Sequence, residues 1–336
     1  MNTTIKEIAE KARVSIATVS RALNGNPKVK PDTKELIIAL ANQLDYKPNI
    51  MARNLVKKRA NTIGIILPEA VDDFFTEIIK GIDEIAYAGN YITMVAGTHS
   101  ERSMAESVIN FMGRGVVEGI IVMSPSMNEP LKEILKKSDT PIVLISSKNE
   151  LDKYDSVGID NFQGAYSMVE YLIKAMGYKK IAHISGPILN NDAIERQIGY
   201  TQALRNNGIE VREDWIISGD FSIKNGEYAC RRLLSLLEKP DIIFAGNDMM
   251  ALGCYKAIES FGLKIPDDIG IVGYDDIFIS QFLTPRLTTV HVPIVELGRT
   301  AASLLMHRIA NGSSKEAKHI KISTGIVVGN SCRPVN

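Results

Sequence analysis

The chain has 336 residues, and 39 Lys/Arg are balanced by 39 Asp/Glu. This length allows two or three units that each bury a core. The charge is unevenly placed, because residues 1–60 carry 12 basic and 5 acidic side chains. A basic head on an acidic body is typical of a polyanion-binding module joined to a part that does not bind nucleic acid.

The cysteine pattern and the apolar runs exclude several classes of protein. Cys230, Cys254 and Cys332 are widely spaced and form no metal-binding pair, so we interpret them as reduced packing residues. No apolar run is long enough to span a bilayer. The N-terminus predicts a polar helix rather than a signal peptide. We therefore expect a cytoplasmic protein with no membrane role.

The first elements predict a helical DNA-binding head. Apolar residues recur at helical spacing over residues 4–12, a turn follows at Arg13 and Val14, and Ser15 is expected to cap a second helix. This pair of helices would place the start of the second helix against base edges in the major groove. Periodicity alone leaves an ordinary helical hairpin open. A third helix beginning at Pro31 supplies enough apolar residues to close a core.

A linker is predicted over residues 46–61. Pro48 stops the third helix, and Asn49 can cap a short helix over residues 50–57. Two helical turns are too short to be stable alone in water, so we expect this hinge to become helical only on DNA. Leu55 would then be exposed, unless it packs against the body.

These segments resemble the lac repressor (LacI/GalR) family of bacterial transcription regulators. The resemblance is carried by residues 4–9, 14–15, 18–21, Asn24 and the hinge at 46–55, and residues 24–31 are similar to the carbon catabolite control branch. It implies that Leu55 is a wedge that enters the minor groove and kinks the duplex. The residues predicted to contact DNA are Thr4, Ser15, Ile16, Ala17, Thr18, Ser20, Arg21, Asn24, Asn49, Met51, Ala52 and Leu55.

From residue 62 onward, strands and helices alternate in two similar rounds. Strands are expected at 63–68, 91–95, 119–123, 142–145, 181–185, 241–245, 269–273 and 320–323, with residues 215–218 as a further short segment. Helices are expected at 74–88, 103–112, 131–136, 164–175, 195–206, 226–237, 249–260 and 296–310. Such alternation predicts α/β lobes with parallel sheets covered on both faces.

The expected domains are a helix-turn-helix domain (1–48), a hinge (49–61) and a two-lobed body (62–336). The resemblance implies a body like a periplasmic sugar-binding protein, in which the chain crosses between lobes more than once. We expect an N-lobe near 62–161 plus 290–320, and a C-lobe near 162–289 plus 321–336.

Candidate ligand-binding residues follow the predicted strands, because ligands of parallel sheets bind beyond the carboxyl ends of strands. The candidates are Phe74, Phe75, Ser124, Asp160, Arg196, Phe221, Asn247 and Asp275. Arginine, amide and carboxylate groups suit a small polar ligand, and phenylalanine rings can stack on its apolar face. The resemblance implies effector contacts for Arg196, Phe221, Asn247 and Asp275.

Structural roles remain open for several of these acidic residues. Asp160 and Asp248 can each cap the helix that follows, and Asp276 can serve in a turn. A purely structural ion pair between Arg196 and Asp275 is the alternative to ligand contact.

Catalysis has little support in this sequence. Phosphate-binding loops, hydrolase motifs and grouped histidines are absent, so we predict no enzyme activity, no metal and no cofactor. The leading hypothesis is a transcription regulator, a repressor in particular, that binds a near-palindromic operator as a homodimer and responds to a small molecule such as a sugar. The alternatives are a catabolite regulator with a phosphoprotein corepressor, and a sugar-binding protein without a DNA role.

Overall fold

The computed structural model describes residues 4–23, 26–46, 60–68, 73–97, 103–113, 115–124, 126–146, 153–312 and 316–335. The chain divides into two compact units, Met1–Ala60 and Asn61–Asn336. Within the described residues, no helix combines the length and apolar character that crossing a membrane requires.

The first unit is a bundle of three helices, α1 (Ile5–Lys11), α2 (Ile16–Leu23) and α3 (Pro31–Gln43). Thr4 caps α1, since its side chain accepts a hydrogen bond from the Glu7 amide. The core that the helices share consists of Ile8, Ala9, Ala12, Val19, Ala22, Ile37 and Ala41. Because all three helices contribute to this core, α2 is held firmly against α1 and α3.

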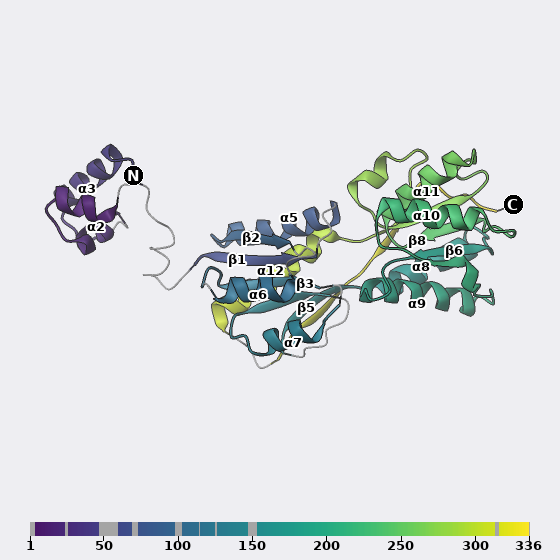
Figure 1. Ribbon diagram of the computed structural model, residues 1–336, viewed down its shortest axis with the longest axis horizontal. Helices are drawn as coiled ribbons and strands as arrows, with labels where there is room; N and C mark the ends of the chain where they lie inside the picture. The colour runs from purple at the N-terminus through teal and green to yellow at the C-terminus, as the bar shows by residue number, and fades with distance from the viewer. Residues whose placement is uncertain are drawn as a thin grey trace. The chain divides into compact units, whose positions relative to one another are not determined.

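The second unit contains two six-stranded sheets, which form its N-lobe and C-lobe (Figure 1). The N-lobe sheet has the order β11-β5-β4-β3-β1-β2, and every pairing in it is parallel. Its strands are β1 (Thr62–Leu67), β2 (Ile92–Gly97), β3 (Gly119–Met123), β4 (Ile142–Ile145), β5 (Asp155–Ile159) and β11 (His319–Ile322). The helices of this lobe are α5 (Asp73–Ala88), α6 (Met104–Gly113), α7 (Glu129–Lys136) and α12 (Ile294–Asn311).

The C-lobe sheet has the order β12-β10-β9-β8-β6-β7, and only β12 is antiparallel to its neighbour. Its strands are β6 (Ile181–Ser185), β7 (Ile216–Ser218), β8 (Ile242–Ala245), β9 (Gly270–Asp275), β10 (Thr288–His291) and β12 (Gly325–Val327). The helices are α8 (Asn161–Lys174), α9 (Asn191–Asn206), α10 (Ile223–Leu234) and α11 (Asp248–Ser260), with 3₁₀ turns at Glu213–Trp215 and Phe278–Phe282.

The sheet memberships require the chain to pass between the lobes three times. It leaves the N-lobe after β5, returns between β10 and α12, and leaves again between β11 and β12. In Figure 1 the yellow C-terminal helix α12 accordingly lies among the blue elements of the N-lobe. There α12 packs closely on α5, because a Cβ at Gly81 would lie 2.1 Å from the carbonyl oxygen of Val295.

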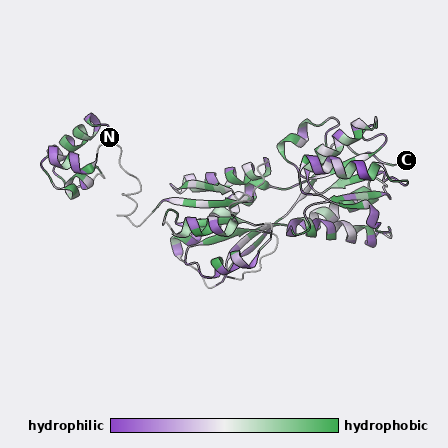
Figure 2. Cartoon of the chain, in the orientation of Figure 1, coloured by the Kyte–Doolittle hydropathy of each residue, from purple (hydrophilic) through white to green (hydrophobic). Residues whose placement is uncertain are grey.

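Burial explains why the central strands are continuous apolar runs. All six residues of β1 are buried, whereas β2 at the sheet edge is largely exposed. Both faces of a parallel sheet are covered by helices, so its inner strands need apolar side chains on both sides. Figure 2 shows the result as hydrophobic strands flanked by helices with one hydrophilic side.

The predicted fold class is confirmed. β3, β4 and β6 have the predicted bounds, and most other predicted elements differ from the observed ones by a few residues. The prediction for α10 was wrong by a helical turn, because Ser222 caps the helix by accepting a hydrogen bond from the Asn225 amide. Strands β5, β10 and β12 were not predicted. The domain and lobe boundaries given from the sequence stay a prediction.

Candidate functional site

The second helix of the first unit begins with the expected cap. The Ser15 hydroxyl accepts a hydrogen bond from the Thr18 amide at 3.1 Å and lies 2.9 Å from the Thr18 hydroxyl. Arg13 in the preceding turn has a φ of 52°, a left-handed conformation that reverses the chain sharply. The helix-turn-helix geometry therefore follows from residues 13–18.

One face of α2 is left open to solvent. Val19 and Ala22 are buried in the head's core, whereas Ile16, Ala17 and Arg21 are exposed and Thr18 and Ser20 are half-buried. Ile16 is 48% exposed, which is unusual for a branched apolar side chain. This face is available for a partner. The remaining predicted DNA contacts, Asn24, Asn49, Met51, Ala52 and Leu55, lie outside the described residues.

The body contains a cavity of about 300 Å³ between its two lobes. The N-lobe lines it with Pro68, Phe74, Phe75, Met123, Ser124 and Ile145. The C-lobe lines it with Pro187, Asn190, Asp192, Arg196, Asp220, Phe221, Asn247 and Asp275. One wall is therefore almost entirely apolar and the other is polar and charged, as a ligand with one apolar face and several polar groups requires.

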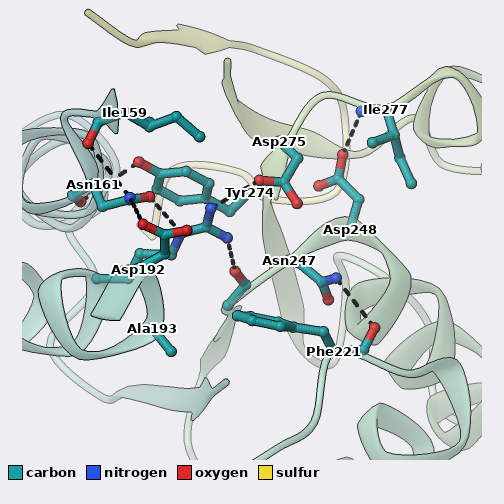
Figure 3. A network of polar contacts seen from close by, with 12 residues as sticks. Ile159, Asn161, Asp192, Ala193, Phe221, Asn247, Asp248, Tyr274, Asp275 and Ile277 are labelled. Atoms are coloured by element: carbon teal, nitrogen blue, oxygen red, sulfur yellow. Dashed lines mark hydrogen bonds and ion pairs between the residues drawn. The ribbon is translucent and has the colours of Figure 1, made fainter. Parts of the chain in front are cut away.

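Arg196 of α9 is the centre of the polar wall. Figure 3 labels Asn161, Tyr274 and Asp275, which surround its guanidinium. Its Nε donates to Asn161 Oδ1 at 2.8 Å, one terminal nitrogen donates to the Gly246 carbonyl at 2.6 Å, and the other lies 3.1 Å from Asp275 Oδ1. The guanidinium also lies 3.8 Å from the ring centroid of Tyr274. Burial by itself lowers the pKa of Arg196, but the nearby charges of Asp275, Tyr274 and Asp192 together more than reverse this and raise the pKa above its ordinary value.

Asp275 is held in place by an unusual turn. Asp275 and Asp276 have φ values of 107° and 58°, so two successive non-glycine residues adopt a left-handed backbone. The buried Asp248 supports this turn, since its carboxylate accepts hydrogen bonds from the Ile277 amide at 3.0 Å and from the Thr289 hydroxyl at 2.6 Å. Burial, with the nearby charge of Asp275, raises the pKa of Asp248 well above its usual range.

The remaining polar groups of the wall are positioned by helix starts and turns. Asn247 caps α11 by accepting a hydrogen bond from the Met250 amide, and its amide nitrogen donates to the Phe221 carbonyl at 3.2 Å. Asn190 caps α9 in the same way, through the Ala193 amide. These helix starts meet at the cavity because the carboxyl ends of parallel strands face the same edge of a sheet.

The structure brings seven of the eight predicted ligand-binding residues into one cavity. Asp160 is not among the described lining residues, and it caps α8 by accepting a hydrogen bond from the Gln163 amide at 3.3 Å. The predicted cap at Asp248 was wrong, since Asn247 caps α11 and Asp248 supports the turn after β9. The role of the seven residues in binding stays a prediction.

Two acidic residues of the lining, Asp192 and Asp220, were missed by the sequence reasoning. Asp192 lies one helical turn before Arg196 in α9, and this i, i+4 spacing could have indicated a shared face. Asp220 directly precedes Phe221, which was selected.

Histidine and cysteine do not form a metal centre in the described part of the chain, where no group of three potential ligands is found. His183 lies buried in β6 between the rings of Tyr200 and Phe244, and its Nδ1 is 2.9 Å from the Phe244 carbonyl. It is a packing residue of the C-lobe.

The head and the two-lobed body define a DNA-binding regulator with a ligand-binding body. Residues 4–49 match the family model "Bacterial regulatory proteins, lacI family", and residues 60–328 match "Periplasmic binding proteins and sugar binding domain of LacI family". The chain belongs to the LacI family and is a DNA-binding transcriptional regulator.

Similar proteins cover almost the whole chain. Catabolite control protein A of Priestia megaterium is 38% identical over 306 residues, which are 91% of this chain and 92% of that protein. The HTH-type transcriptional repressor PurR of Photobacterium profundum is 30% identical over 334 residues, 99% of each chain.

Two solved structures match nearly the whole chain. The lac repressor dimer bound to operator and the anti-inducer ONPF has a TM-score of 0.86 at 26% identity, and the match covers 98% of this chain and 99% of that one. The complex of the transcriptional regulator CelR with cellobiose has a TM-score of 0.75 at 28% identity, with 98% and 100% covered.

Proposed function

We propose that this protein is a repressor that binds a near-palindromic operator as a homodimer, and that a sugar or sugar derivative in the interlobe cavity changes its operator affinity. The observation that carries the effector half of this proposal is the cavity itself, with an apolar wall on one lobe and the Arg196–Asp275 pair on the other.

The exposed face of α2 supports the operator half. Arg21 can pair with a guanine, and Ile16 or Ala17 can contact a thymine methyl group. The predicted contacts Thr4, Ser15, Thr18 and Ser20 would hold the start of α2 against the DNA. A single head reads only half a site, so two heads are expected on a near-palindrome. Such operator binding would take place in the cytoplasm.

Relatives support the repressor and sugar assignments by their names and ligands. PurR relatives are named transcriptional repressors, one similar structure is a cellobiose complex, and another, a LacI family regulator of Enterococcus faecium, holds ribose. The same cavity in this chain offers carboxylate and amide groups for hydroxyls and Phe74, Phe75 and Phe221 for a sugar ring face.

A phosphoprotein corepressor is the second candidate, favoured by the 38% identity to a catabolite control protein. In that case operator affinity would respond to a protein partner and not to a sugar alone. A sugar-binding protein without a DNA role is disfavoured by the helix-turn-helix head.

Retention of promoter fragments tests the operator half. The wild-type chain should select fragments of its own promoter region over random DNA, more strongly at low than at high salt, since phosphate contacts release counterions. Arg21→Ala should reduce selective binding by roughly 10- to 100-fold through the lost base contact. Arg205→Ala, an exposed arginine of α9 in the body, is the matched control. Equal retention of all sequences by the wild-type chain would contradict the proposal.

A further inference from the structure

The polar wall of the interlobe cavity carries an excess of negative charge. Asp192, Asp220 and Asp275 line it together with a single cation, Arg196. Arg196 already pairs with Asp275 at 3.1 Å, with both side chains less than one-tenth exposed. The carboxylates of Asp192 and Asp220 therefore have no matching cation among the described lining residues.

The side-chain donors of this wall are largely occupied by the protein. All three nitrogens of Arg196 have protein partners, and the amide nitrogen of Asn247 donates to the Phe221 carbonyl. On the opposite wall, the Ser124 hydroxyl donates to the Ser126 carbonyl at 2.5 Å. Beyond the side-chain amide nitrogen of Asn190 and the starts of α9 and α11, a ligand consequently meets few groups among the described lining residues that could stabilise an anion.

The acceptors of the wall remain available. Asp192 Oδ1 accepts a hydrogen bond from the side-chain Nδ2 of Asn161 at 2.9 Å, and Asp220 Oδ1 accepts one from the backbone amide of Ser222 at 2.9 Å. The second oxygen of each carboxylate has no partner within the described residues. An ionised carboxylate only accepts hydrogen bonds, so these oxygens favour hydroxyl and ammonium donors.

From this inventory we propose that the cavity selects its ligand by charge: it takes a neutral polyhydroxylated ring or its amine-bearing analogue, and it rejects phosphorylated or carboxylated sugars. The inference rests on the effector role proposed above and narrows it. A cavity of about 300 Å³ lies at the lower end of the range for small-molecule sites, which favours a single sugar ring.

Calorimetric titration of the full chain without DNA tests this selection. The probes are matched series: glucose, glucosamine and glucose 6-phosphate; galactose, galactosamine and galactose 6-phosphate; ribose and ribose 5-phosphate. In the series that binds, the phosphorylated member should bind at least about tenfold more weakly than the neutral parent. A unit charge near the half-buried carboxylate of Asp192 changes affinity by about this factor. The exposed Asp220 is screened by solvent and adds less. The amino sugar should bind at least as tightly as the parent.

The double variant Asp192→Asn, Asp220→Asn assigns the selection to these residues. Asparagine keeps the Oδ1 acceptor that each site uses within the fold, so the variant removes charge while preserving those hydrogen bonds. The preference for neutral over phosphorylated sugar should shrink by about tenfold. Asp241→Asn, an exposed residue at the opposite end of β8, is the matched control and should change nothing.

Three results would overturn the inference: a phosphorylated sugar that binds as tightly as its parent, an unchanged preference in the double variant, or no binding by any neutral or amino sugar of the panel. Because no DNA is present, these results are distinct from a failure of operator regulation, which is measured by retention of promoter fragments.

Discussion

Removing the Arg196 guanidinium should destabilise the C-lobe strongly. In Arg196→Met the Asp275 carboxylate stays buried without its counter-charge, and Asn161 Oδ1 and the Gly246 carbonyl lose their donor. The side chains of the pair are only 5% and 8% exposed, so solvent does little to compensate. Breaking such a pair from one side costs about 3–5 kcal/mol.

Denaturant unfolding followed by the fluorescence of Trp215 measures this loss, because Trp215 is the chain's only tryptophan and is buried in the C-lobe. Arg205→Met, an exposed arginine on the same helix, is the control and should stay within about 0.5 kcal/mol of the wild type. Adding Asp275→Asn to Arg196→Met should cost less than the two single losses together, by about 1.5 kcal/mol or more. A loss below about 1 kcal/mol for Arg196→Met, or strict additivity, would refute the reasoning.

Further predictions concern a buried histidine, a tight glycine and a helix cap. Burial lowers the pKa of His183 from 6.5 to about 4. Between these two pH values the unfolded chain therefore protonates His183, whereas the folded chain does not. The contribution of neutral His183 to the free energy of unfolding is therefore intact above pH 6.5, and about 3 kcal/mol of it is lost as the pH falls to about 4. His183→Phe should flatten the plot of unfolding free energy against pH over this range. An unchanged slope would contradict the burial of a neutral His183. Gly273→Ala would place a Cβ 2.2 Å from Asp248 Oδ1, and calorimetry should show a loss of about 1–3 kcal/mol with weaker sugar binding. Ser15→Ala should destabilise the head by about 1 kcal/mol in thermal unfolding followed by circular dichroism; no loss would exclude the cap.

The periodicity of apolar residues predicted the fold well wherever an element is long or fully buried. Residues 181–185 form a run with a single histidine, and the predicted strand coincides with β6. Strands β5 and β10 escaped prediction because they are short and contain polar residues, and β12 escaped because it is only three residues long. Asp155 at the start of β5 is buried by its ion pair with Arg308 of α12, a partner 153 residues away that no local pattern indicates.

Much of the candidate cavity could be predicted because parallel strands gather their carboxyl ends at one edge. Asn247 and Asp275 follow strands directly, and both line the cavity. Asp160 also follows a strand, but it caps α8 instead. Whether a residue after a strand only caps the next helix or also lines the cavity depends on where that helix begins relative to the other lobe. The local sequence does not indicate this position.

The coupling between cavity and operator is the central claim, and its most direct test is reciprocal. The affinity of the tightest-binding sugar of the panel is measured with and without a saturating operator duplex, and operator affinity is measured with and without that sugar. Both affinities should change by the same factor, roughly 5- to 150-fold, because linkage between two binding sites is reciprocal. Operator affinity that stays unchanged at saturating sugar would contradict the coupling.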